Sequence, residues 1–371
     1  MKNSSTTGLD QQWIPWWQVN FGPQAAKAAQ EEILAGRISM GKTTQHFEKT
    51  ICQELNVRFC VATSSGTTAL LMALMALNIK PGDVVAVQDR SWISPAHAAH
   101  LLNANLLLID VSKEIPVVDF KHFLKVIKRK PKVVVIVHMN GRSENIKRIS
   151  DECSDNGISL IEDAAQAIGS KNDGHFLGTV GDIGCFSLAI SKTVSSGQGG
   201  FCVTNNPNLY EKLLSLRTHG TNNVFDPKWS DHGMNFRYTD PQAAIALDQL
   251  QKLPTRIEQQ HLYRQNYVEN FRKLGGIKMN PIDPDSGQCG PYFDAWTHNG
   301  AEVKSLLKDV GVESRRYYPP IASANYLRIE NRNEIVNAAY WHEHGLVLPS
   351  GPNLSVEQLD YVTNASCKVL K

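Results

Sequence analysis

The chain has 371 residues, which is enough to bury a sizeable core and to form two or three domains. Its 38 lysines and arginines nearly balance its 36 aspartates and glutamates, giving a net charge of +2. This balance gives no electrostatic reason to expect nucleic acid or an anionic membrane as a partner, and we therefore expect small-molecule ligands.

Residues 1–12 are polar, with neither the basic start nor the apolar stretch of a secretory signal. No later stretch reaches the roughly 18 apolar residues of a membrane span. These features predict a cytoplasmic protein that does not associate with a membrane. The seven cysteines contain no CxxC pair, which favours free thiols over disulfides or a metal cluster.

Short β-branched runs alternate with helical patterns from residue 57 to residue 203. This alternation predicts an α/β fold with a mostly parallel, seven-stranded sheet flanked by helices. The expected strands are 58–62, 84–88, 106–110, 133–137, 158–162, 183–187 and 201–204. The expected helices between and after these strands are 67–77, 95–104, 120–128, 145–156 and 207–217.

The last third of the chain has a different pattern. Residues 240–274 have the periodicity of a long amphipathic helix that Pro254 could break. A smaller α+β region follows, with expected helices near 301–310, 333–344 and 355–370. We therefore expect a flexible tail at 1–12, a large α/β domain at 13–245 and a small α+β domain at 246–371.

Residues 36–43, GRISMGKT, match the P-loop pattern GxxxxGK[ST]. A P-loop needs a buried strand directly before its first glycine, whereas residues 25–35 have a helical pattern. The dinucleotide fingerprint GxGxxG is missing after the first expected strand. Both observations argue against nucleotide hydrolysis or dinucleotide binding.

Three segments at the ends of expected strands could carry chemistry. Ser65-Gly66-Thr67 opens a helix, where free amides and hydroxyls can bind an anion or simply cap the helix. Asp163 emerges at the carboxyl end of an apolar strand, where open α/β sheets bind ligands, although an acid there can also cap a turn. Lys192 follows another strand in a loop of small residues, and a solvated surface lysine is the alternative.

One cofactor requires all three features. Pyridoxal phosphate has a dianionic phosphate, a ring nitrogen that accepts electrons well only when protonated, and an aldehyde that reacts with an amine. Gly66 and Thr67 would bind the phosphate. Asp163 would keep the nitrogen protonated, and Lys192 would carry the cofactor as a Schiff base. Trp92 is the candidate for covering the ring face, with an ordinary core tryptophan as the alternative.

A longer series of motifs occurs in one order along most of the chain. The series is Gly36 to Gly41 with Phe47-Glu48, Ser65-Gly66-Thr67, Glu162-Asp163-Ala164-Ala165-Gln166, Cys185-Phe186-Ser187 with Lys192, Gly199-Gly200, Asn235-Phe236-Arg237, Tyr318-Pro319-Pro320 and Leu348-Pro349-Ser350. It resembles the DegT/DnrJ/EryC1/StrS family, the pyridoxal-phosphate-dependent sugar aminotransferases of fold type I. The resemblance implies that fold and that cofactor.

The resemblance also implies roles for single residues. Lys192 would bind the cofactor and then move the proton, Asp163 would face the ring nitrogen, and Gln166 would contact the ring's phenolic oxygen. The residues around the phosphate would be Ser65, Gly66, Thr67 and Ser187. Asn235 would reach the phosphate of the neighbouring subunit, which implies a homodimer with sites at the interface. Arg237 and Tyr318 would contact the substrate.

The activity that the resemblance implies is transfer of an amino group from glutamate or glutamine to a keto sugar. The acceptor would be linked to a nucleotide and would serve cell-surface polysaccharide or secondary-metabolite formation. One alternative is a sugar dehydratase of the same family, in which histidine replaces the lysine. Another is a catalytically silent, regulatory member. The chain departs from the family pattern at Tyr317, where many members have histidine, and over residues 277–297.

Two pairs of histidines have spacings that could bind a metal, namely His97 with His100 and His342 with His344. The sequence suggests no third ligand for either pair. We therefore expect no metal site.

Overall fold

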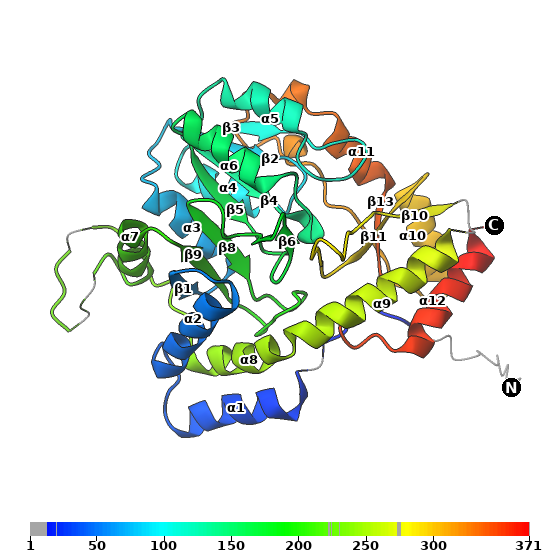
Figure 1. Ribbon diagram of the computed structural model, residues 1–371, viewed down its shortest axis with the longest axis horizontal. Coiled ribbons are helices and arrows are strands. Elements are labelled where there is room, and N and C mark those ends of the chain that lie inside the picture. Colours follow the sequence, from blue (N-terminus) through cyan, green and yellow to red (C-terminus); the bar gives the residue numbers. More distant parts are fainter. Residues whose placement is uncertain are drawn as a thin grey trace, which may run out of the picture.

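The computed structural model describes residues 13–19, 21–221, 223, 225–229, 231–272 and 276–370. Its largest element is a seven-stranded sheet with the order β1-β9-β8-β5-β4-β2-β3 (Figure 1). The strands are β1 (Phe59–Thr63), β2 (Val84–Gln88), β3 (Asn105–Ile109), β4 (Val133–Val137), β5 (Ser159–Asp163), β8 (Ile183–Ser187) and β9 (Gly200–Thr204). Within this sheet β9 alone runs antiparallel to its neighbours, which confirms the predicted, mostly parallel arrangement.

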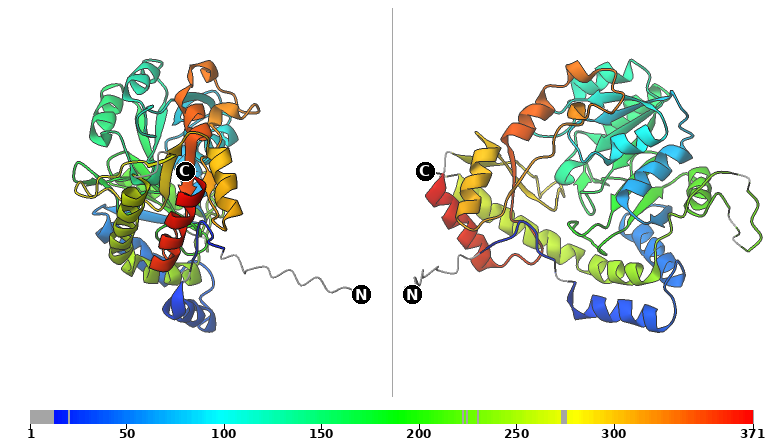
Figure 2. Two further views of the ribbon diagram at one scale, coloured as in Figure 1. Left: turned by 90° about the vertical axis from the view of Figure 1, so that its right-hand side faces the viewer. Right: turned by 180° about the vertical axis from the view of Figure 1, so that it is seen from behind.

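Helices cover both faces of the large sheet, as the front and rear views show (Figures 1 and 2). One face packs against α2 (Lys42–Glu54), α5 (Phe120–Ile127), α6 (Ile146–Asp155) and α8 (Asp240–Gln251). The other face packs against α3 (Gly66–Ala76), α4 (Ser94–Leu101) and α7 (Pro207–Arg217). The first helix, α1 (Gly22–Leu34), lies along α8 (Figure 1). The result is the three-layer α/β arrangement that the sequence predicts.

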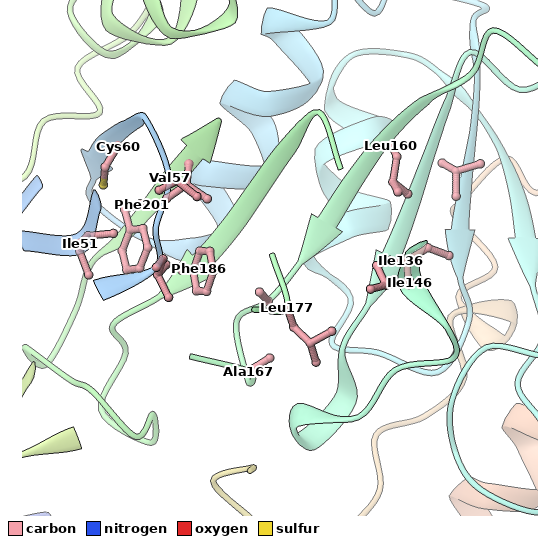
Figure 3. Close-up of a cluster of buried hydrophobic side chains, with 14 of the residues drawn as sticks. Ile51, Val57, Cys60, Ile136, Ile146, Leu160, Ala167, Leu177, Phe186 and Phe201 are labelled. Atoms are coloured by element: carbon pink, nitrogen blue, oxygen red, sulfur yellow. The ribbon is translucent and has the colours of Figure 1, made fainter. Parts of the chain in front are cut away.

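The strands are apolar on both sides because both faces of the sheet are covered. The five residues of β4, Val-Val-Val-Ile-Val, are all buried. Figure 3 shows the core on one face, where the rings of Phe186 and Phe201 stack with their centroids 4.6 Å apart. A close-packed core of this kind holds the ends of the strands in fixed positions.

The expected strands of this sheet agree with the observed ones to within one residue at each end. The prediction for 240–274 allowed a break at Pro254, and the structure has a break close to it, because α8 ends at Gln251 and α9 (Leu253–Phe271) begins after Lys252. Pro254 lies in the first turn of α9, where proline is tolerated since its missing N–H has no helical partner there. Residues 273 and 274 of that expected helix lie outside the described residues.

The helix expected at 333–344 begins later than predicted, because α11 spans Asn337–His344. The carboxylate of Asp110, at the end of β3, accepts the N–H groups of Val336, Asn337 and Ala338 at 2.9–3.0 Å. A carboxylate favours a helix start because it satisfies amides that have no partner within the helix. Asp110 therefore determines where α11 begins and attaches it to the large sheet.

A second, four-stranded antiparallel sheet has the order β10-β11-β13-β12. Its strands are β10 (Ile277–Met279), β11 (Phe293–Thr297), β12 (Arg315–Arg316) and β13 (Gly345–Leu348). Helices α9, α10 (Gly300–Asp309) and α12 (Val356–Val369) share a hydrophobic core with this sheet. A short hairpin pairs β6 (Lys171–Asn172) with β7 (His175–Phe176).

The division into domains at residue 245 stays a proposal. That position lies inside α8, and Ile14 of the segment 13–19 packs in the core of the second sheet. The proposed tail, 1–12, lies outside the described residues. No helix in the described ranges is long and apolar enough to cross a membrane. All seven cysteines are free, as expected.

Candidate active site

Polar side chains gather at the edge of the large sheet where β1, β5 and β8 end. These three strands point in one direction, because β9 lies between β1 and β8 and is antiparallel to both. A cavity of about 400 Å³ opens at this edge. The predicted residues that line it are Ser65, Gly66, Thr67, Trp92, Asp163, Gln166, Ser187, Lys192 and Tyr318.

The segment after β1 forms the start of α3, with Ser65 as its N-cap. The Ser65 hydroxyl accepts the N–H of Thr68 at 3.1 Å, and Thr68 Oγ1 accepts the N–H of Ser65 at 2.9 Å. The amides of Gly66 and Thr67 have no hydrogen-bond partner among the described residues. The capping interpretation thus holds for the Ser65 hydroxyl, while two amides stay available for an anion.

Close packing brings the start of β9 against this helix start. A Cβ atom on Gly200 would lie 2.5 Å from the carbonyl carbon of Ser65 and 2.6 Å from the nitrogen of Gly66. Glycine is therefore the one residue that lets the two backbones approach this closely. Ser187, at the end of β8, lies beside Gly66 and completes the wall of the cavity.

Asp163 ends β5 and is buried, with its Oδ1 atom accepting the N–H of Ala165 at 3.0 Å. No donor within the described ranges pairs with its Oδ2 atom. Burial raises the pKa of Asp163, and the Ala165 amide, Lys192 and His138 oppose this effect. A cationic group in the cavity would therefore gain a favourable partner in Asp163.

Lys192 lies in the loop after β8 with its Nζ atom 5.9 Å from the centroid of the Tyr292 ring. Burial lowers the pKa of Lys192, while Tyr318 and Asp163 act in the opposite direction. A lower pKa leaves more of the amine neutral, and only the neutral amine attacks a carbonyl carbon. The environment of Lys192 thus differs from that of a solvated surface lysine.

Gln166 and Trp92 occupy two other walls of the cavity. Gln166 is 7% exposed, and its Oε1 atom accepts the N–H of Asn140 at 3.0 Å. Trp92 is 57% exposed, and its ring forms a T-shaped pair with that of Tyr318, with the centroids 5.0 Å apart. Such exposure does not fit the core-tryptophan alternative, and the proposed contact with the cofactor ring stays a prediction.

Asn235 and Arg237 do not line this cavity. Both lie between α7 and α8, and the Nε atom of Arg237 donates to Oδ1 of the exposed Asn235 at 2.9 Å. This placement leaves the Asn235 side chain accessible to another molecule. Its proposed role in a neighbouring subunit stays a prediction, as does the substrate role of Arg237.

Sequence reasoning missed several residues of the cavity, among them Trp16, Ser94, Tyr292 and Arg315. Ser94 shares a hydrogen bond of 2.8 Å with the hydroxyl of Thr67. The rings of Trp16 and Tyr292 lie 5.7 Å apart, and Arg315 lies over Trp16. Tyr292 comes from residues 277–297, where the family pattern is weakest. The one available signal was the unusual aromatic cluster Trp13 to Trp17 in a polar amino-terminal segment.

The P-loop-like segment is not a phosphate site. Helix α1 precedes Gly36, where a P-loop would need a strand. The amides of Gly41 and Thr44 donate to Oδ1 of the buried Asp240 at 2.8 and 2.9 Å. A carboxylate of the chain itself therefore occupies the position that a bound phosphate would need. In the described part of the chain, no cluster of three or more acidic, histidine or cysteine side chains could hold a metal.

The fold and the site define a class of protein: a fold type I transferase with a lysine, a buried carboxylate and the start of a helix around one cavity. A model of the DegT/DnrJ/EryC1/StrS aminotransferase family matches residues 21–366, and the chain belongs to this family.

Named relatives agree with this assignment. GDP-perosamine synthase of Escherichia coli O157:H7 is 30% identical, covering 87% of this chain and 89% of its own length. The UDP-4-amino-4,6-dideoxy-N-acetyl-beta-L-altrosamine transaminase of Campylobacter jejuni is 26% identical, covering 93% of each chain. The solved structure of a DegT DnrJ EryC1 StrS aminotransferase from Brucella abortus matches with a TM-score of 0.86 at 25% identity, covering 94% of this chain and 95% of that one.

These findings confirm the expected activity class, a pyridoxal-phosphate-dependent sugar aminotransferase. The dehydratase alternative has less support, because this chain has Lys192 where that branch is expected to have histidine.

Proposed function

We propose that this enzyme takes an amino group from glutamate or glutamine and transfers it to a keto sugar linked to a nucleotide. The names of the relatives, which contain a GDP-linked and a UDP-linked sugar, support a nucleotide sugar as the acceptor. The observation that carries the proposal is the joint placement of Lys192, Asp163 and the start of α3 around one cavity. The reaction would take place in the cytoplasm, and its product would serve the formation of cell-surface polysaccharide or of a secondary metabolite.

The residues present fit pyridoxal phosphate. The unpaired amides of Gly66 and Thr67, with the hydroxyls of Ser65 and Ser187 nearby, provide donors for its phosphate. The Oδ2 atom of Asp163 provides a negative charge for its ring nitrogen. The bound cofactor would supply an electron sink through which an amino group is exchanged.

Each protein group then has a defined task. With the cofactor bound, Lys192 would hold its aldehyde carbon through Nζ, the carbonyl oxygen leaving as water, and the freed amine would take up the proton that leaves the donor's α-carbon. Asp163 would hold the ring nitrogen in its protonated form. Gln166 would hold the phenolic oxygen, and Trp92 would cover the ring face and exclude water from one side.

A groove of about 720 Å³ adjoins the cavity and shares Trp92, Arg315 and Tyr318 with it. Its basic residues are Lys304, Lys308, Arg315 and Arg316, and Glu313 is its acidic residue. The exposed ring of Trp13 offers a surface on which a base can stack. We propose that the nucleotide diphosphate of the acceptor lies in this groove, with its sugar directed toward Lys192.

Replacing Lys304 and Lys308 together by glutamine should raise the KM for the nucleotide sugar about 10-fold with little change in kcat, because each lysine contributes charge to diphosphate binding. Steady-state kinetics with the acceptor measure this effect. The glutamate half-reaction should be unaffected. The exposed pair Lys125 and Lys147, changed in the same way, is the matched control. An unchanged KM for the nucleotide sugar would contradict the binding of the nucleotide in this groove.

The proposal includes a homodimer, in which the exposed Asn235 of one chain contacts the phosphate site of the other. Replacing Asn235 by alanine should then weaken cofactor binding about 10-fold, because one hydrogen bond to a charged group is lost. Equilibrium dialysis of pyridoxal phosphate measures the affinity, and sedimentation measures the assembly. A monomeric wild type with full activity would contradict the dimeric site.

The test of the function is an acceptor screen. The purified protein, supplied with pyridoxal phosphate and glutamate, is incubated with a panel of GDP-linked and UDP-linked keto sugars. Mass spectrometry then gives the masses of the products. The proposal expects one acceptor class to exchange its carbonyl oxygen for an amino group. Amination of free keto acids alone would contradict a sugar substrate.

A further inference from the structure

Arg90 is a buried arginine whose charged group forms no ion pair with any residue that the structure describes. The residue follows β2 and is 6% exposed. Its Nε and Nη1 atoms are enclosed without a hydrogen-bond partner, and no ion pair to it occurs among the described residues. Its contact with the Tyr317 ring, whose centroid lies 3.8 Å from Cζ, supplies no acceptor oxygen. Enclosing charged donors without acceptors is costly, so this guanidinium is prepared for a partner that the described part of the chain does not supply.

Arg90 lines a small cavity beside the one that contains Lys192. The two cavities share Trp16, Gln166, Tyr292, Arg315 and Tyr318 as lining residues. A ligand group in the small cavity would therefore belong to a molecule whose other end can lie near Lys192.

The charges around the small cavity favour an anion. Arg90, Arg315 and Arg316 line it, and Asp294 is its one acidic lining residue. Asp294 is already paired with the buried Arg142 and with Arg264. Although burial opposes ionisation, these two arginines hold the pKa of Asp294 well below its usual range. Asp294 therefore stays charged, and its charge favours the ionised form of Arg90. Its ion pairs, however, are with Arg142 and Arg264, and no residue that the structure describes forms an ion pair with Arg90.

The volume of the small cavity limits the size of the anionic group that it can hold. Its volume is about 50 Å³. On this measure one water molecule needs roughly 10–15 Å³, so the cavity suits a group of a few heavy atoms, such as a carboxylate, and is too small for a sugar ring or a nucleotide. We propose that Arg90 binds a carboxylate group of the amino donor and so directs the donor's amine toward Lys192. This proposal rests on the proposed aminotransferase function and assigns the donor an anionic subsite.

A purely structural role for Arg90 makes a different prediction about stability. If stacking on Tyr317 were its purpose, replacing Arg90 by methionine would lower the melting temperature. If Arg90 is retained for a ligand, the change should leave the melting temperature of the ligand-free protein equal or higher, because it removes a buried, unpaired charge. Thermal unfolding of the two proteins separates these roles.

The direct test is calorimetric titration of the holoenzyme with glutarate, a dicarboxylate without an amine. We expect binding by the wild type and a 10- to 100-fold weaker affinity for Arg90→Met, a range that follows from about 1.5–3 kcal/mol for a charged hydrogen bond. Arg129→Met is the matched control, because Arg129 forms an exposed ion pair with Glu330 at 2.8 Å. It should bind glutarate like the wild type, and the neutral analogue glutaramide should bind weakly to all three proteins.

Equal glutarate affinity of Arg90→Met and the wild type would overturn the proposal, as would a wild type that binds no glutarate. Weaker pyrophosphate binding with unchanged glutarate binding would also overturn it, since Arg90 would then serve the nucleotide. If Arg90→Met does not fold, Arg90→Gln must show the same loss of affinity. None of these results depends on sugar amination, so failure here is distinguishable from failure of the proposed function.

Discussion

Replacing Lys192 by alanine should abolish amino transfer, with a loss in kcat of at least about 10⁴-fold, because the group that moves the proton and the amine that binds the aldehyde are both removed. Reduction with borohydride followed by mass spectrometry gives a second readout. The wild type should retain the mass of the cofactor on the peptide that contains Lys192, whereas the variant should lose it on denaturation. Pyridoxal phosphate should still bind reversibly through the helix start at Gly66 and Thr67.

The control for this change is Lys147→Ala, since Lys147 is exposed and pairs with Asp151 on the surface of α6. It should have wild-type activity and retain the cofactor. Normal turnover by Lys192→Ala, or borohydride labelling at another lysine, would contradict the assigned role.

Replacing Asp163 by asparagine should lower kcat by about 10²- to 10³-fold while the cofactor stays bound, because a neutral amide cannot hold the ring nitrogen in its protonated form. Asp151→Asn, on an exposed face of α6, is the matched control. Steady-state kinetics give the rate, and equilibrium dialysis gives the cofactor affinity. Full activity of Asp163→Asn would refute the pairing with the ring nitrogen.

The same variant should change the pH dependence of cofactor attachment. Burial lowers the pKa of Lys192, and the negative charge of Asp163 raises it. Removing that charge should lower the pKa of Lys192 further, so the neutral amine becomes available at lower pH. The pH at which cofactor attachment reaches half its maximal rate should therefore be lower in the variant. The appearance of the visible band measures this rate. A midpoint that moves upward would mean that the two side chains do not interact in this way.

Local patterns in the sequence predict the large sheet well. Continuous apolar runs such as Val133 to Val137 predict strands that are covered on both faces. Small residues and helix caps mark the ends of these runs. The sequence alone could place Thr67, Asp163 and Lys192 at one site, because the carboxyl ends of parallel strands meet at one edge of a sheet.

The missed features depend on contacts between distant parts of the chain. Asp110 determines where α11 begins, although the two are more than 200 residues apart. Tyr292 and Trp16 enter the cavity from separate segments that have no local catalytic pattern. Nothing in the neighbourhood of Arg90 in the sequence indicates that it is buried without an ion-pair partner among the described residues, because that depends on the placement of Tyr317 and Asp294.

The central claim is that Lys192, Asp163 and the start of α3 together form a pyridoxal-phosphate site for amino transfer. The most direct test is the visible absorbance spectrum of the purified protein, with pyridoxal phosphate supplied, before and after addition of glutamate. We predict a yellow band that disappears when glutamate is added and returns with 2-oxoglutarate. A protein that stays colourless in the presence of pyridoxal phosphate, or a band that neither glutamate nor glutamine changes, would contradict the claim.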